Sequence, residues 1–223
     1  MREILAKYYR EYHEIIYHVI MLAGIIVGLV KFKKLSSSSR IFLLLLFITP
    51  IVELTSFYCA IKFRNNNIIY NPFTIVEFSF IAIAFFVETR LKSLIPMFIS
   101  LLLFATLNGI FFQPFFLSLN TNTILLSSLF IITWFFVFLS LYFKNSDTEP
   151  LRNFSFFWVG AGWMLFSVTS IISFGFMKLY TKHGIWDDVS TVTRQISNYI
   201  LYLSFIVSFL SPQKSLNDIV ANK

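Results

Sequence analysis

The chain of 223 residues is 57% hydrophobic, contains 29 Phe and has a mean hydropathy of +0.75. An ordinary water-soluble fold is excluded, because too few polar residues remain to cover a globule. The formal net charge is +7. No basic run with interleaved aromatic residues lies outside the apolar stretches, so we expect this charge to set membrane topology and expect no nucleic-acid partner.

Seven apolar stretches follow one another, each about as long as the ~20 residues that a membrane-spanning helix needs. The expected spans are Tyr12–Phe32, Ile41–Ile61, Phe73–Thr89, Leu94–Phe112, Thr123–Phe143, Phe154–Phe176 and Val189–Leu210. The runs are continuous, whereas a membrane β-barrel would show short alternating segments. The predicted fold class is therefore all-α, a polytopic bundle of seven transmembrane helices whose partner is the lipid bilayer.

The division of the chain follows from these spans. We expect a transmembrane domain over residues 12–210 and a short cytoplasmic tail over residues 211–223. Residues 1–11 mix apolar and charged side chains, so they fit an interfacial amphipathic segment and equally a polar extension of the first helix.

Lys and Arg in short connections predict the orientation. Ten follow the odd-numbered spans: Lys31, Lys33, Lys34, Arg40, Arg90, Lys92, Lys144, Arg152, Lys214 and Lys223. Eight lie on the other side: Arg2, Lys7, Arg10, Lys62, Arg64, Lys178, Lys182 and Arg194. Because these totals are similar, the orientation depends on the dense group of basic residues after the first span, which we expect on the cytoplasmic side. We therefore expect the N-terminus outside and the C-terminus inside.

Two acidic residues lie within predicted spans, where an ionisable group costs ~2.5 kcal/mol or more at the bilayer centre. Glu53 precedes Ile61 by eight residues, or ~12 Å along a helix, and Glu77 follows Asn71 by six residues, or ~9 Å. In the predicted orientation the two carboxylates share a depth below the outer surface. We expect them to belong to one site.

Polar side chains on other spans reach the same outer level. The predicted ligand-binding residues are Glu53, Glu77, Arg194, Asn198, Asn108 and His18. Arg194 is the expected counter-charge of Glu77. The inner half of the spans is nearly all apolar, so this pattern favours a site for a small ligand, an ion or a proton that opens toward the outer face.

A purely structural interpretation stays open for these residues. Asn108 and Asn198 fit interhelical hydrogen bonds, worth ~0.6 kcal/mol each, equally well. Glu77 could likewise bind the side chain of Asn71, Tyr58 or Tyr199.

Several chemistries are not expected. Glu14 and His18 share a helix face but provide only half of a metal ligand set, and the single Cys59 excludes disulfides. The sequence has no glycine-rich phosphate loop, no Gly-x-Ser-x-Gly and no His-Glu-x-x-His motif, and the last span has no lysine for a retinal Schiff base. We therefore expect no catalytic residues, no cofactor, no metal and no enzyme activity.

Local features predict details of the helices. The small-residue faces at Gly24 and Gly28 and at Gly160 and Gly162 favour close helix packing within the chain. Asn71 followed by Pro72 is typical of an N-cap and first turn, and it predicts the start of the third helix.

The order of the spans allows a repeat. Spans two and three resemble spans six and seven in pattern, which gives a 3+1+3 plan like that of SWEET-type sugar transporters and some vitamin transporters. The Pro-Gln signature of those relatives is missing from the spans, and Pro212–Gln213 lies beyond the last one as a chance match. A small transporter is therefore the alternative to a binding module.

Three short segments carry a family resemblance: Ile51–Leu54 (IVEL), Asn67–Phe78 (NIIYNPFTIVEF) and Ile196–Tyr202 (ISNYILY). In these segments the chain resembles a group of uncharacterised seven-helix bacterial membrane proteins, and it is similar to the membrane regions of some bacterial sensor kinases. The resemblance implies a multi-pass protein of the cell inner membrane, sensor-like, with Glu53, Glu77 and Asn198 as characteristic polar positions. Because the sequence holds no kinase module, we expect a signalling partner protein.

Overall fold

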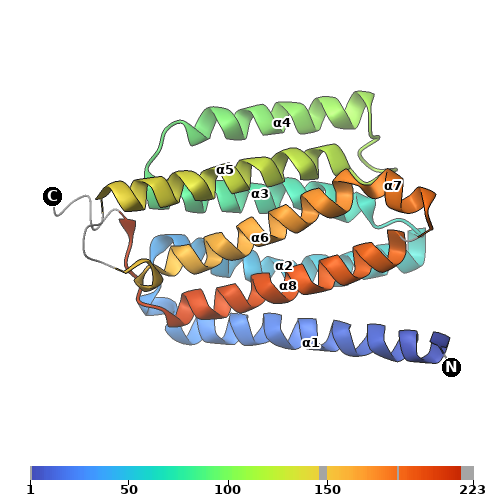
Figure 1. The fold of residues 1–223 in the computed structure, drawn as a ribbon, viewed down its shortest axis with the longest axis horizontal. Coiled ribbons are helices and arrows are strands. Elements are labelled where there is room, and N and C mark those ends of the chain that lie inside the picture. Colours follow the sequence, from blue (N-terminus) through green and yellow to red (C-terminus); the bar gives the residue numbers. More distant parts are fainter. Residues whose placement is uncertain (1, 146–149, 185, 217–223) are drawn as a thin grey trace.

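The computed structural model describes residues 2–145, 150–184 and 186–216, without the side chains of residues 2–14, 178, 186–191 and 194. Long helices run side by side along the molecule (Figure 1). Their bounds are α1 (Arg2–Lys31), α2 (Ser37–Phe63), α3 (Asn67–Thr89), α4 (Leu94–Phe111), α5 (Thr121–Asn145), α6 (Ser155–Gly175) and α8 (Trp186–Leu210). The short α7 (Met177–Lys182) precedes α8, and the 3₁₀ turns η1 (Phe32–Lys34) and η2 (Leu151–Asn153) follow α1 and precede α6.

The helices have the length and composition of membrane spans. Six of them are long and apolar enough to cross a bilayer, and α8 contributes the shorter apolar stretch Gln195–Leu210. Large apolar side chains such as Leu54, Phe57 and Phe111 are exposed on the outer surface of the bundle, where lipid is the compatible solvent. The predicted all-helical membrane bundle is confirmed, and the protein is a multi-pass membrane protein.

The start of α3 differs from the prediction. The helix begins at Asn67, so Asn71 and Pro72 lie inside it. The side chain of Asn65 accepts a hydrogen bond from the backbone N–H of Asn67 at 2.9 Å, which stabilises an earlier start than the Asn71–Pro72 pair indicates. The Asn71 side chain is thereby free to bind the connection between α4 and α5.

The helices pack in a definite order. The α2–α3 hairpin packs together, α6 lies between α5 and α8, α8 packs against α1, and α4 lies at the edge against α5 and α3 (Figure 1). Small residues allow two of these contacts. A Cβ atom built at Gly28 would lie 2.4 Å from Leu43 of α2, and one at Gly162 would lie 2.0 Å from Ser204 Oγ of α8. Both small-residue faces thus serve packing within the chain.

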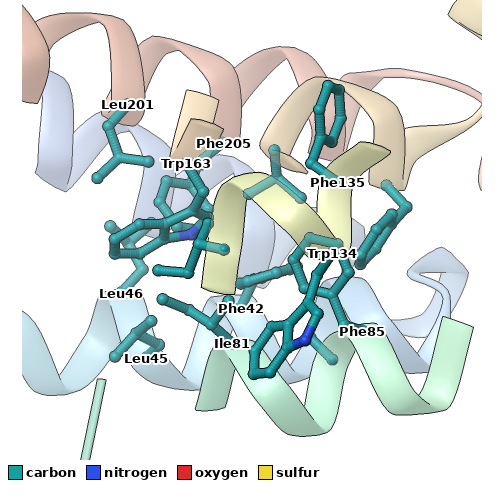
Figure 2. Packing of buried hydrophobic residues seen from close by; sticks show 14 of the residues in the cluster. Phe42, Leu45, Leu46, Ile81, Phe85, Trp134, Phe135, Trp163, Leu201 and Phe205 are labelled. Carbon is teal, nitrogen blue, oxygen red and sulfur yellow. The ribbon is translucent and has the colours of Figure 1, made fainter. Parts of the chain in front are cut away.

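We call the end of the bundle that carries connections 32–36 and 90–93 the inner end, and the opposite end the outer end, after the predicted orientation. Near the inner end lies a layer of fully buried phenylalanines, which we call the inner aromatic layer. Its members are Phe42, Phe85, Phe138, Phe156 and Phe205. The Phe85–Phe156 and Phe138–Phe156 ring centroids are 4.8 and 4.9 Å apart, and Figure 2 shows Phe42, Phe85 and Phe205 within this packing. The interior is therefore closed toward the inner end.

Candidate functional site

The two carboxylates of the predicted spans lie at the same level of the α2–α3 hairpin. Glu53 is ten residues before Phe63, the last residue of α2, and Glu77 is ten residues after Asn67, the first residue of α3. Each therefore lies ~15 Å from the connection between the two helices, at 1.5 Å per residue.

Three tyrosine hydroxyls surround these acids. Tyr17 of α1 donates a hydrogen bond to Glu53 Oε1 at 3.2 Å, and Tyr70 of α3 donates to Glu53 Oε2 at 3.0 Å. The hydroxyls of Tyr17 and Tyr202 of α8 lie 3.3 Å apart, within hydrogen-bond distance. Four helices thus meet in one polar group inside the bundle, which we call the carboxylate–tyrosine cluster: Tyr17, Glu53, Tyr70, Glu77 and Tyr202.

A small cavity lies beside Glu77. It measures about 10 Å³, and its walls include Thr49 of α2, Trp163 of α6 and Tyr202 of α8. Leu45, Leu46, Leu201 and Phe205, all visible in Figure 2, complete the lining. This volume suits one water molecule and nothing larger.

Glu77 and Trp163 have unused hydrogen-bonding capacity at this cavity. The carboxylate of Glu77 makes no hydrogen bond with any residue that the structure describes. The indole Nε1–H of Trp163, a residue only 2% exposed, also has no acceptor there. Buried polar groups are nearly always paired, so the unpaired N–H of Trp163, at a cavity that the partly buried Glu77 also lines, indicates a binding site.

The other predicted site residues lie elsewhere or outside the description. His18 is exposed on α1, with its ring in edge contact with Tyr17 at a centroid distance of 4.8 Å. Asn198 lies one turn before Tyr202 on α8 and is partly buried. Arg194 belongs to α8, but its side chain is outside the described part of the structure, so its predicted pairing with Glu77 stays a prediction.

Asn108 belongs to a separate group of amides at the outer end. Its Nδ2 donates to Asn120 Oδ1 and, at 3.0 Å, to Gln113 Oε1, while its Oδ1 accepts from Asn122 Nδ2 at 2.9 Å. Asn71 joins the group, because its Nδ2 donates to the Ser118 carbonyl at 2.8 Å and its Oδ1 accepts from the Asn120 backbone at 3.0 Å. These bonds fasten the α4–α5 connection to α3, so the structural interpretation of Asn108 fits its surroundings.

The tyrosines were not among the predicted site residues. Tyr17 and Tyr202 lie inside their spans, where a tyrosine is not an interfacial anchor, and this position is the signal that could have indicated them. The pairing itself leaves no trace in the sequence, because 185 residues separate the two hydroxyls.

A further carboxylate inside the bundle, Glu88, was also missed, and unlike the partly buried Glu53 and Glu77 it is fully buried. It is 1% exposed at the inner end of α3. Its Oε2 accepts from Ser38 Oγ at 2.8 Å, and its Oε1 accepts from the backbone N–H of Leu216 at 2.8 Å. Gln213 holds the same segment, since its Oε1 accepts from the Ser36 N–H at 3.1 Å. Residues 211–216 are therefore docked on the inner end, and Gln213 has a structural role that the sequence did not indicate.

The cluster has few chemical options. No group of three or more His, Cys, Asp or Glu side chains that could hold a metal ion is found in the described part of the chain. Carboxylates, phenols and one indole N–H can bind a small polar species or exchange a proton. Searches with protein-family models, among curated proteins and among solved structures found no match to this chain.

Proposed function

We propose that the protein is a sensor-like, ligand-binding seven-helix module of a bacterial inner membrane. Its N-terminus lies outside and its C-terminus inside, and it acts through a partner protein. The carboxylate–tyrosine cluster is the binding site. The observation that carries this proposal is the meeting of Glu53 and Glu77 with tyrosines of α1, α3 and α8 beside a cavity inside the helix bundle. Ionisable groups at such depth are costly and are typical of functional sites.

The size of the cavity limits the ligand. A space of about 10 Å³ excludes a sugar, a vitamin or another organic molecule in this conformation, because small-molecule pockets measure ~300 Å³ or more. A proton, a water molecule or a single small ion is the class that fits.

Binding is favoured over transport by the packing toward the inner end. A transporter needs a route from the site to the other membrane surface, and alternating access places polar or small residues along it. Phe42, Phe85 and Phe156 are 0% exposed and close that route. A small transporter of 3+1+3 plan remains the second candidate function. It is favoured by the similar sequence pattern of spans two and three and spans six and seven of this chain.

Measurements of thermal stability and of ion or proton flux under the same conditions distinguish the binding module from the transporter. The purified protein is heated in detergent at several pH values and with NaCl, KCl or choline chloride, and the same conditions are applied to proteoliposomes that contain a pH-sensitive dye. We expect a pH- or ion-dependent shift of the melting temperature that is lost in E53Q and E77Q, without flux.

E88Q is the matched control, since it makes the same chemical change in a buried carboxylate at the other end of the bundle, and it should keep the shift. Flux that depends on Glu53 or Glu77 would favour the transporter. If E53Q and E77Q respond to every condition as the unmodified protein does, the site has no binding role.

A further inference from the structure

The two carboxylates of the cluster have unequal surroundings. Glu53 accepts hydrogen bonds from two phenols, Tyr17 at 3.2 Å and Tyr70 at 3.0 Å. Glu77 receives no hydrogen bond from the described residues and lines the cavity together with four apolar side chains, Thr49, Trp163 and Tyr202. The hydrogen-bonding capacity of Glu53 is therefore used by two phenols, whereas the carboxyl group of Glu77 can still take a further partner at the cavity.

The cavity supplies a partner for a protonated Glu77. An indole N–H can only donate, and the N–H of Trp163 has no acceptor in the described part of the chain. A species that bridges Trp163 and Glu77 must therefore accept one hydrogen bond and also interact with the carboxyl group. Water meets this requirement and fits a volume of about 10 Å³. A bare cation cannot accept a hydrogen bond and would face the positive edge of the indole ring.

We propose that the ligand of the cluster is a proton, held by Glu77 as a carboxylic acid and bridged to Trp163 Nε1–H by one water molecule. The step is the transfer of a proton from a hydronium ion of the outer aqueous phase to a Glu77 oxygen: one hydronium O–H bond breaks and leaves a water molecule, and one O–H bond forms on Glu77. The hydroxyls of Tyr17 and Tyr202, 3.3 Å apart, connect Glu53 with the cavity, because Tyr17 bonds Glu53 and Tyr202 lines the cavity wall. This inference rests on the proposed function and narrows it to one ligand.

The titratable groups around Glu77 come from three helices. α2 contributes Glu53, α3 contributes Tyr70, and α8 contributes Tyr202. Beyond these, Tyr17 of α1 reaches the cluster, and α6 contains no titratable side chain.

One cation of the sequence bears on the proposal. Arg194 lies two turns before Tyr202 on α8, and its side chain is outside the description. If Arg194 pairs with Glu77, the carboxylate stays charged. The experiment therefore includes R194Q.

Infrared difference spectroscopy of the protein in lipid bilayers, recorded between acid and alkaline pH in heavy water, measures the proton directly. We expect a carboxylic-acid C=O band in the unmodified protein at neutral pH that is lost in E77Q. The band should still be found in E88Q, where only the pH at which it is lost can change. W163F should shift the frequency of the band, because the bridging water loses its donor. W158F is the matched control: the Trp158 indole already donates to the Arg152 carbonyl at 3.1 Å, so its loss should leave the band in place.

Each alternative has its own result. A band that is absent from the unmodified protein and is gained in R194Q shows an ion pair between Arg194 and Glu77 and overturns the proposal. A band that is lost at constant pH in NaCl but kept in choline chloride shows that a cation is the ligand. That result overturns the proposal of a proton ligand and leaves the proposed binding function in place. A band that persists in E77Q belongs to another acid and also overturns the proposal. E77Q resembles the protonated form and should fold, which its melting curve checks.

Discussion

Gly162 provides the sharpest test of the helix packing that builds the cavity wall. A Cβ atom at this position would lie 2.0 Å from Ser204 Oγ, 2.7 Å from Ser204 Cβ and 3.5 Å from Leu201. The Ser204 Cβ is attached to the backbone of α8, so G162A must push α6 and α8 apart. Overpacking of this kind costs ~1–3 kcal/mol, and the better helix propensity of alanine returns at most ~1 kcal/mol. We expect G162A to lower the free energy of unfolding by about 1–2 kcal/mol.

The assay is unfolding in mixed detergent–SDS micelles, followed by circular dichroism. S204G removes both clashing atoms, so the G162A/S204G double variant should be more stable than the sum of the single effects, with a coupling energy of ~1–2 kcal/mol. G175A is the matched control, because no atom lies within 4 Å of a Cβ at Gly175. The reasoning is refuted if G162A has the same free energy of unfolding as the unmodified protein, or if adding S204G to G162A does not restore stability.

Three further predictions test other parts of the structure. N71A should destabilise the protein by ~1–3 kcal/mol in the same unfolding assay, because it leaves buried partners in the α4–α5 connection unpaired, whereas N67A, which loses only an exposed 3.3 Å bond, should stay near the unmodified value. E88Q should release residues 211–216, because hydrogen bonds to charged groups contribute ~1.5–3 kcal/mol. A cysteine at Leu216, which is 2% exposed in the docked tail, should then react with maleimide tenfold faster or more. An unchanged rate would contradict the role of Glu88. In a background without the native cysteine, L117C should react with a membrane-impermeant maleimide applied to intact cells, and protection of this 76% exposed position would reverse the predicted orientation.

Hydrophobic length made the helices predictable, and sequence spacing along one hairpin made part of the site predictable. Glu53 and Glu77 lie at the same level because they are equally many residues away from the short connection between α2 and α3, and this spacing can be read from the sequence. The hydrogen bonds between distant helices depend on how each helix is rotated about its axis. In a membrane helix that is apolar on nearly every side, hydropathy does not report this rotation. Tyr17 and Tyr202 were missed for that reason.

The errors at helix ends have a different cause. Asn71–Pro72 has the composition of a helix start, yet Asn65 begins the helix earlier and Asn71 bonds across to the α4–α5 connection. Glu88 has the sequence position of an ordinary interfacial acid beside Arg90. In the structure, Ser38 of α2 and the returning residues 211–216 both bond it at the inner end. Local sequence carries no information about a partner 128 residues away.

A sensor requires that the site and the inner end be linked, and α3 is the element that carries both. Glu77 and Glu88 are eleven residues apart, which places them on the same helix face, ~16 Å from one another along the axis. Glu77 faces the cavity, and Glu88 holds the Leu216 N–H and Ser38. A small shift or rotation of α3 on protonation of Glu77 would therefore move the acceptor that docks the tail.

Linkage makes this coupling testable in both directions. If E77Q changes the maleimide reactivity of L216C by some factor, undocking the tail with E88Q must change the proton affinity of Glu77 by the same factor, because coupling free energies are reciprocal. Couplings of this kind are typically ~1–3 kcal/mol, or 5–150-fold. The pH at which the infrared band is lost in E88Q measures one direction. The labelling rate of L216C in E77Q, compared with that in the otherwise unmodified protein at an alkaline pH at which Glu77 has lost its proton, measures the other. A shift in only one of the two measurements is thermodynamically inconsistent with a two-state α3 switch and would assign the tail a purely structural role.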